Sequence, residues 1–343
     1  MTLVKILHNT RRRNTNIIHE IANLAGVSVP TVYKVFSDTY TTGEAIQEKV
    51  LQAAKELHYT PKTKSSPLKQ KEKVVAVILS EVMNPFINSL IDAITKELNN
   101  FQYKVIVLYS NENVRMEESN LSLLSMLQID ALIYGPISGN RYPQIDELIK
   151  EGKPVIQLFS PVYEQLDTIM FDDAHGTYQA VKKLLQSGHK KIMMIYRKRP
   201  IMPSREPGYY KAFKETGLEV NPDFLFSLDV QDSIKGMIKD KVKELKPTAI
   251  LSANESISIA TIQALDELNL KVPSDVSMIL YDDSPWEATM GYTAVAHPLE
   301  QVGTLCRNLI MKENGNKSQG RQAPAKLVID PMIISRNSVR IVQ

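Results

Sequence analysis

Eight short apolar runs constrain the fold of this chain more than any other feature of its sequence. Each run is six to eight residues long, and helical patterns lie between most of them. The runs cover residues 74–80, 104–110, 130–135, 154–160, 168–173, 191–196, 248–254 and 276–283. Near-continuous apolar strands that alternate with helices are typical of parallel sheets covered by helices on both faces. The sequence therefore predicts an α/β body over residues 74–343.

Two features divide this body into two similar parallel-sheet subdomains. The predicted strands are too many for one ordinary sheet, and the segment IDALIYG (129–135) is echoed by PTAILSA (247–253). We place the first subdomain at about 74–161 plus 291–323 and the second at about 162–290 plus 324–343.

Short polar side chains follow several of the predicted strands at their carboxyl ends. They are Ser80, Ser160, Asp172, Asp173, Asn254, Asp282 and Asp283. In sheets of this kind, ligands bind outside the carboxyl ends of the strands. A cleft between two subdomains that is lined by such groups suits a small polyhydroxylated ligand.

The segment before the body predicts a small all-α domain over residues 16–60. Its first helix carries an apolar stripe, and Gly26 can end that helix in the left-handed conformation. Ser28 is a suitable N-cap for a second helix, whose first turn tolerates Pro30. A third helical pattern follows, with Val50 in its apolar stripe. Two helices joined by a glycine turn indicate a helix-turn-helix unit, which places its second helix in the major groove of DNA.

Charge is distributed unevenly along the chain. Residues 1–73 contain 12 Lys and Arg against 6 Asp and Glu, and the remainder contains 29 against 32, which accounts for the totals of 41 and 38. A basic head on a mildly acidic body favours contact between the head and a polyanion. The alternative is a solvated basic face with no such partner.

The motif A-G-V-S-V-P-T-V (25–32) near the N-terminus resembles the DNA-binding head of the lac repressor (LacI/GalR) family of bacterial transcription regulators. The similarity extends through the rest of the chain. It includes MNPF (83–86), REPG (205–208), ANE (253–255), YDD (281–283) and SRNSV (335–339). The resemblance implies a periplasmic-binding-protein-like body behind the helix-turn-helix head.

The resemblance also implies which residues of the head contact DNA. Base- and phosphate-reading positions of the family's second helix correspond to Val29, Pro30, Tyr33 and Lys34, and we expect phosphate contacts from Ser28 and Thr31. Lys34 is suited to guanine, whereas Val29 and Pro30 offer only apolar contact. The alternative for Tyr33 is a packing role at the rim.

Between head and body, residues 61–73 form a predicted hinge linker rich in Pro, Ser and Lys. In the family this stretch folds on DNA into a short helix whose leucine, here Leu68, wedges into the minor groove. Pro67 directly precedes Leu68 and disfavours such a helix. Residues 1–15 form a basic N-terminal extension outside the resemblance.

In the body, the resemblance implies that Arg205, Asn254 and Asp282 hold a small effector, often a sugar, with Phe86 as an apolar wall. We add Trp286 as a residue that stacks on a sugar ring, with a core or interface role as the alternative.

Three positions near this predicted site depart from the family pattern. Phe159 and Asp173 stand where many relatives have Asp and Asn, and Glu255 replaces another Asp. We include Phe159 in the site, and these departures leave the identity of the effector open.

Several classes of protein find no support in the sequence. The single cysteine, Cys306, excludes a disulfide framework and fits a reducing cytoplasm. We find no export signal, no apolar run of about 18 residues and therefore no membrane span. Common catalytic and metal-binding motifs are absent, so we expect no enzyme activity, no cofactor and no metal.

Together these observations predict a cytoplasmic transcription regulator, most simply a repressor. Its expected partners are a pseudo-palindromic DNA operator, a sugar or sugar phosphate effector and a second copy of the chain, since two-fold symmetry of the protein matches a two-fold site. Two alternatives remain: a regulator that depends on a protein co-repressor, and a sugar-binding protein with a weakened head.

Overall fold

The computed structural model describes residues 17–37, 43–59, 72–198, 201–228, 234–315 and 323–342. The chain divides into two compact units, Met1–Glu72 and Lys73–Gln343, and each is described by itself. Residues 1–15, Leu68 and most of the predicted hinge lie outside the described residues, so those predictions stay as they are.

The first unit contains three short helices, as predicted. Helical residues 17–25 are followed by Gly26 with φ +65°, and then by α2 (Val29–Ser37) and α3 (Glu44–Glu56). Ser28 caps α2, because its Oγ accepts a hydrogen bond from the N–H of Thr31 at 3.3 Å. One buried cluster joins the three helices: Ile18, Ile21, Ala22, Ala25, Val32, Val35, Val50, Ala53 and Ala54. The apolar stripes therefore form the core of the helix-turn-helix head.

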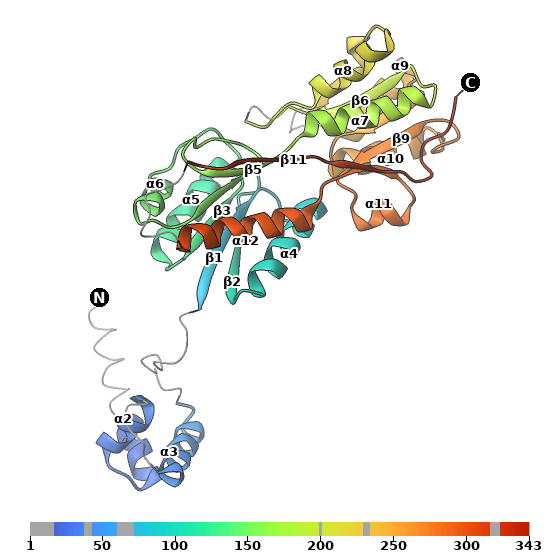
Figure 1. Ribbon diagram of the computed structural model, residues 1–343. Coiled ribbons are helices and arrows are strands. Elements are labelled where there is room, and N and C mark those ends of the chain that lie inside the picture. Colours follow the sequence, from blue (N-terminus) through green and yellow to red (C-terminus); the bar gives the residue numbers. More distant parts are fainter. Residues whose placement is uncertain are drawn as a thin grey trace, which may run out of the picture. The chain divides into compact units, whose positions relative to one another are not determined.

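The second unit contains two six-stranded sheets (Figure 1). The first is parallel throughout, in the order β11-β5-β4-β3-β1-β2. Its strands are β1 (Lys73–Leu79), β2 (Tyr103–Tyr109), β3 (Ala131–Tyr134), β4 (Val155–Leu158), β5 (Asp167–Phe171) and β11 (Lys326–Ile329). The second has the order β12-β10-β9-β8-β6-β7, and only β12 runs antiparallel to its neighbour. Its strands are β6 (Ile192–Arg197), β7 (Leu225–Leu228), β8 (Ala249–Ser252), β9 (Ser277–Tyr281), β10 (Thr293–Ala296) and β12 (Met332–Ile334).

Helices cover both faces of each sheet, as the apolar strands require. In the first subdomain, α4 (Pro85–Asn99) and α12 (Leu299–Gly315) share one buried cluster with the sheet, while α5 (Val114–Met126) and α6 (Pro143–Lys150) share the other. In the second subdomain, α7 (Asp173–Gln186) and α8 (Glu206–Thr216) cover one face, and α9 (Ile234–Leu245) and α10 (Glu255–Glu267) the other. The short α11 (Pro285–Thr289) and the 3₁₀ turn Pro222–Phe224 complete it.

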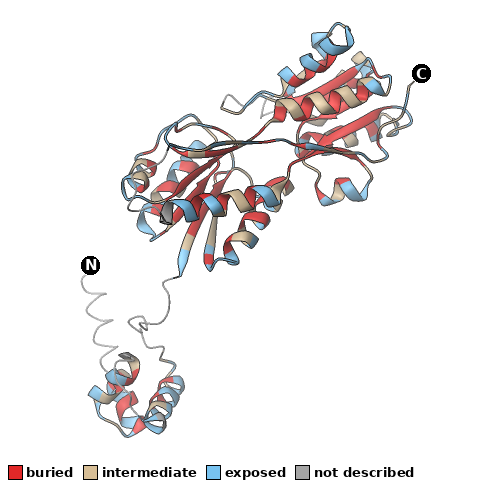
Figure 2. Ribbon diagram, in the orientation of Figure 1, coloured by how far each residue is buried: buried red, intermediate tan, exposed pale blue. Residues whose placement is uncertain are grey.

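Burial follows the predicted layers. Figure 2 shows the central strands of both sheets buried, and the helices buried only on the side that faces a sheet. β3, β8 and β9 are buried along their whole length, which explains why their sequences are continuously apolar instead of alternating. The prediction of two similar parallel-sheet subdomains is confirmed.

The strand order corrects the predicted subdomain bounds in three places. β5 lies in the first sheet and β10 in the second, whereas the sequence places 162–290 in the second subdomain and 291–323 in the first. β11 joins the first sheet, although the sequence assigns 324–343 to the second. The reason is that the chain passes between the subdomains three times, directly after β5, β10 and β11, at residues 172, 297–298 and 330–331. A strand of four or five residues carries no signal of which sheet it joins.

Candidate functional site

A cavity of about 500 Å³ lies at the carboxyl ends of the strands, with walls from both subdomains. The first subdomain contributes Ser80, Asn84, Phe86, Ile87, Phe159 and Phe171. The second contributes Asp173, Ala253, Asn254, Asp282 and His297, together with Tyr196 and Arg197 at the end of β6 and the residues Lys198, Met202, Pro203, Ser204, Arg205 and Glu206 that follow. This volume is typical of sites for small molecules. The cavity therefore lies where parallel sheets bind their ligands.

Two lining residues have backbone conformations that are rare for residues other than glycine. Phe159 has φ +71° and Asp282 has φ +90°. Both are held by strand pairing, because the N–H of Phe159 donates to the carbonyl of Ile169 at 2.8 Å and that of Asp282 donates to the carbonyl of Val295 at 2.9 Å. Strain of this kind concentrates at functional sites, where the surrounding fold maintains it.

One wall of the cavity is aromatic. Phe86, Phe159 and Phe171 lie with ring centroids 6.0–6.2 Å apart. The ring of His297 packs against two of them, 4.2 Å from Phe171 and 5.3 Å from Phe86. Such rings offer an apolar surface to a ligand that carries its hydroxyl groups on other faces.

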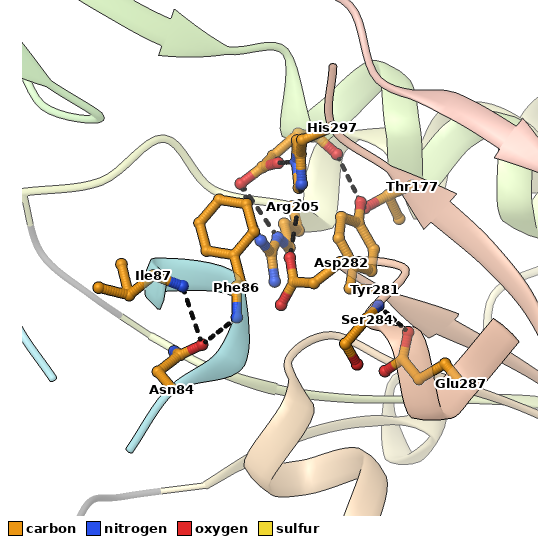
Figure 3. Close-up of polar contacts among 11 residues, drawn as sticks. Asn84, Phe86, Ile87, Thr177, Arg205, Tyr281, Asp282, Ser284, Glu287 and His297 are labelled. Carbon is orange, nitrogen blue, oxygen red and sulfur yellow. Dashed lines mark hydrogen bonds and ion pairs between the residues drawn. The ribbon is translucent and has the colours of Figure 1, made fainter. Parts of the chain in front are cut away.

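Next to the aromatic wall lies a row of four charged side chains, Arg205, Asp173, His297 and Asp282 (Figure 3). Arg205 donates to Oδ2 of Asp173 through Nε at 3.1 Å and Nη2 at 3.0 Å, and its guanidinium lies 4.0 Å from the ring centroid of Tyr281. His297 Nε2 lies 3.1 Å from the other oxygen of Asp173, and Nδ1 lies 3.4 Å from Oδ1 of Asp282. Figure 3 shows Arg205, Asp282 and His297 converging beside Phe86. Positive and negative groups therefore alternate along this charged row.

Because these side chains are buried or half-buried, the charges among them shift the pKa values of Asp173 and His297. Burial by itself would raise the pKa of Asp173, but the charge of Arg205 and the hydrogen bond from His297 lower that pKa to about 2. For His297, burial would lower the pKa, but the carboxylates of Asp173 and Asp282 outweigh burial and raise it. The site therefore favours an imidazolium at His297 between two carboxylates.

Two asparagines at the cavity begin helices and also face the ligand space. Asn254 caps α10, since its Oδ1 accepts from the N–H of Ile257 at 2.9 Å, and Asn84 caps α4 by accepting from the N–H of Phe86 at 3.1 Å. These caps occupy the amide oxygens and fix both side chains. The amide NH₂ groups are then the donors that each subdomain can offer to a ligand.

Five of the six predicted effector residues lie together at the cavity: Phe86, Phe159, Arg205, Asn254 and Asp282. Their roles in binding stay predictions. The sixth, Trp286, is not among the described lining residues. Its indole N–H donates to Glu255, and its ring meets Tyr292 at 6.3 Å within a buried cluster. These contacts favour the alternative, a core role for Trp286, because its indole N–H is already paired with Glu255 and its ring packs against a buried cluster.

Sequence reasoning missed His297 and Phe171. It named Asp173 among the polar residues at strand ends and as a departure from the family pattern, but did not include it among the effector-binding residues. His297 follows β10, a four-residue strand that was not among the eight apolar runs. Its position becomes informative only when β10 is known to lie beside β9. The available signal was a polar residue directly after a short apolar run, His297 after residues 293–296.

In the head, the exposed face of α2 carries most of the predicted DNA contacts. Pro30, Tyr33 and Lys34 are exposed, as is the capping Ser28. Thr31 is half-buried and hydrogen-bonded to Ser28, and Val29 packs against the head core. Val29 therefore presents less apolar surface to DNA than predicted, because part of its side chain is buried against that core.

Of the helices in the described residues, none combines the length and apolar character needed to cross a membrane. The same ranges contain no cluster of three or more His, Cys, Asp or Glu side chains arranged to hold a metal ion.

A helix-turn-helix head followed by a two-subdomain body with an interdomain cavity defines the class of ligand-binding transcription regulators. Residues 17–62 match the bacterial regulatory proteins of the lacI family, and residues 72–336 match the periplasmic binding proteins and sugar binding domain of the LacI family. The chain belongs to the LacI family, and it is a DNA-binding transcription regulator.

Individual relatives agree with this assignment. The chain is 29% identical over 306 residues to the HTH-type transcriptional regulator RegA of Clostridium saccharobutylicum, covering 86% of this chain and 91% of RegA. It is 27% identical over 334 residues to the HTH-type transcriptional regulator DegA of Bacillus subtilis (strain 168), covering 94% and 97%. A solved complex of the transcriptional regulator CelR with cellobiose matches the fold with a TM-score of 0.67 at 23% identity, covering 94% of this chain and 99% of that one.

Proposed function

We propose that this protein is a repressor whose affinity for its operator is controlled by a sugar or sugar phosphate bound in the cavity. The observation that carries this proposal is the pairing of an aromatic wall with the charged row from Arg205 to Asp282. Apolar faces and hydroxyl groups of a sugar need these two kinds of surface at once. The similarity to a cellobiose-binding regulator supports the same class of ligand.

The layout of the cavity suggests how such a ligand controls the protein. Phe86 belongs to the first subdomain, whereas Arg205, Asn254 and Asp282 belong to the second. A ligand that contacts both sets favours one angle between the subdomains, with the three crossing segments as hinges. A ligand shifts a conformational equilibrium only by its difference in affinity for the two states. Contacts from both walls supply that difference.

The remaining parts of the proposal follow from DNA recognition. A homodimer presents two α2 helices to two half-sites, so the operator is pseudo-palindromic. The protein acts in the cytoplasm, where its DNA is, and it acts by binding and not by catalysis.

The proposal is tested by selecting genomic fragments with the purified full-length protein at physiological salt, with and without a panel of sugars and sugar phosphates. We expect recovery of one pseudo-palindromic site that is lost when one member of the panel is added. Recovery of only salt-sensitive, sequence-indifferent fragments would contradict autonomous recognition and would direct attention to a protein co-repressor.

The role of Lys34 in sequence recognition is tested on the same operator. We expect Lys34→Ala to weaken operator binding by about 1–3 kcal/mol and to relax the preference at one base pair, because a lysine that donates to guanine specifies that base. The measurement is a binding titration against the operator and its single-base variants. Lys34→Arg, which keeps the charge, serves as the control. A uniform loss on all sequences would identify Lys34 as a phosphate contact instead.

A further inference from the structure

Among the described residues that line the cavity, every charged side chain but one lies beside a group of opposite charge. Lys198 Nζ lies 3.1 Å from Glu206 Oε1, and Arg205 Nη2 lies 3.0 Å from Asp173 Oδ2. The third carboxylate of the wall, Asp282, lies against His297 at 3.4 Å. Arg197 is the remaining charged group of the lining, and it has no carboxylate partner in the described part of the chain.

The position of Arg197 makes this isolation informative. Arg197 is the last residue of β6, and its backbone pairs with Leu228 of β7, so the base of its side chain is fixed at the carboxyl end of the sheet. The residue is half-buried, and its Nε atom is buried without a hydrogen-bond partner. Partly removing a guanidinium from water costs free energy, and no carboxylate of the described residues compensates that cost at Arg197, so an anion bound there would be stabilising.

Arginine is also the side chain best suited to a phosphate. Its planar guanidinium donates two parallel hydrogen bonds to phosphate oxygens, and these charge-assisted bonds are stronger than neutral ones. Each other cation of the described lining already has a carboxylate, so among these residues an added anion meets Arg197 without displacing an ion pair. A cavity of about 500 Å³ holds a monosaccharide together with a phosphate group.

We infer that the effector is a phosphorylated sugar whose phosphate is bound by Arg197, while the sugar lies between the phenylalanine wall and Asp282. This inference rests on the proposed function and narrows its ligand class. Arg197 then determines specificity for the anion, and the charged side chains from Arg205 to Asp282 hold the sugar. A neutral sugar would add no counterion for Arg197 to those that the described residues supply.

The test measures the affinity of the full-length protein for monosaccharides and for their phosphates by calorimetry, together with thermal stabilisation by inorganic phosphate at constant ionic strength. We expect at least one phosphorylated sugar to bind more tightly than its neutral parent. Arg197→Gln should raise the Kd of that phosphorylated sugar by about 10- to 100-fold, as the loss of charge-assisted hydrogen bonds implies, and leave the Kd of the parent within about twofold. Inorganic phosphate should stabilise the wild type and not Arg197→Gln.

Arg115→Gln is the matched control, since it removes the same charge from an exposed position on α5. It should behave like the wild type with every probe. If neutral sugars bind and release the operator while Arg197→Gln changes nothing, the inference is overturned and the proposed function stands. If no sugar, sugar phosphate or inorganic phosphate alters stability or operator binding, both are rejected.

Discussion

Replacing Arg205 by alanine is expected to abolish the response to the effector and to lower the free energy of unfolding by about 3–5 kcal/mol, as is usual when one partner of a buried ion pair is removed. Asp173 is only 8% exposed, and Arg205 donates two hydrogen bonds to one of its oxygens. Without the guanidinium, that oxygen keeps its burial and loses its partner. Urea denaturation at pH 7 measures the stability, and operator release by the identified effector measures the response.

The pH dependence of this variant gives a second observable. The pKa of Asp173 is lowered to about 2, so its pairing stabilises the protein above the unfolded pKa near 3.8, and this stability is lost as the pH falls toward 2. Removing Arg205 raises that pKa and moves the acid transition to higher pH. The double variant Arg205→Ala, Asp173→Asn is the control. It also removes the buried carboxylate that has lost its partner, so it should recover part of the stability. A loss below about 1 kcal/mol for Arg205→Ala alone would show that the pair contributes no more than a surface ion pair.

Most of the fold was predictable because parallel strands that are buried on both faces have continuously apolar sequences. β1, β3, β8 and β9 are buried on both faces over nearly their whole length, and no alternating pattern competes with that signal. The head was predictable for a related reason. Gly26 and Ser28 mark a helix end and a helix start only two residues apart, which few structures other than a helix-turn-helix accommodate.

The errors have a common physical cause. β10 and β11 are four residues long, and β11 is partly exposed, so neither stands out from a loop in the sequence. Because β10 and β11 were not recognised, the crossings after them were misplaced and His297 was not placed at the site. The crossing after β5 was misplaced for a related reason, since a short strand does not indicate which sheet it joins. The charged row joins residues 173, 205, 282 and 297, which only the fold brings together. Trp286 shows the same limit, since the direction of its indole depends on Glu255, 31 positions away.

A buried acid next to the site leads to the second large effect, and here the expected change is a gain in stability. Glu287 is fully buried in α11, where its Oε2 accepts from the N–H of Ser284 at 3.2 Å and its Oε1 has no partner. Burial, reinforced by the charges of Asp282 and Glu255, raises the pKa of Glu287 to about 9. Glu287 is therefore neutral at pH 7 and does not repel the carboxylate of Asp282.

We expect Glu287→Gln to raise the free energy of unfolding by about 3.5 kcal/mol at pH 7, which is about 1.4 kcal/mol for each pH unit between the ordinary glutamate pKa of 4.5 and pH 7. Between pH 4.5 and 9 the folded wild type retains a proton that the unfolded chain releases, so its stability falls as the pH rises. Glutamine has the same shape as glutamate, can still accept the hydrogen bond from the N–H of Ser284, and does not titrate. The gain should therefore vanish below pH 4.5 and grow toward pH 9.

Urea denaturation of both proteins at pH 5 and pH 8 measures this gain in stability. The exposed Glu118→Gln on α5 is the control, and its effect on stability should not depend on pH in this way. A gain of equal size at both pH values would mean that Glu287 is not protonated in the folded protein and that its burial is compensated in another way.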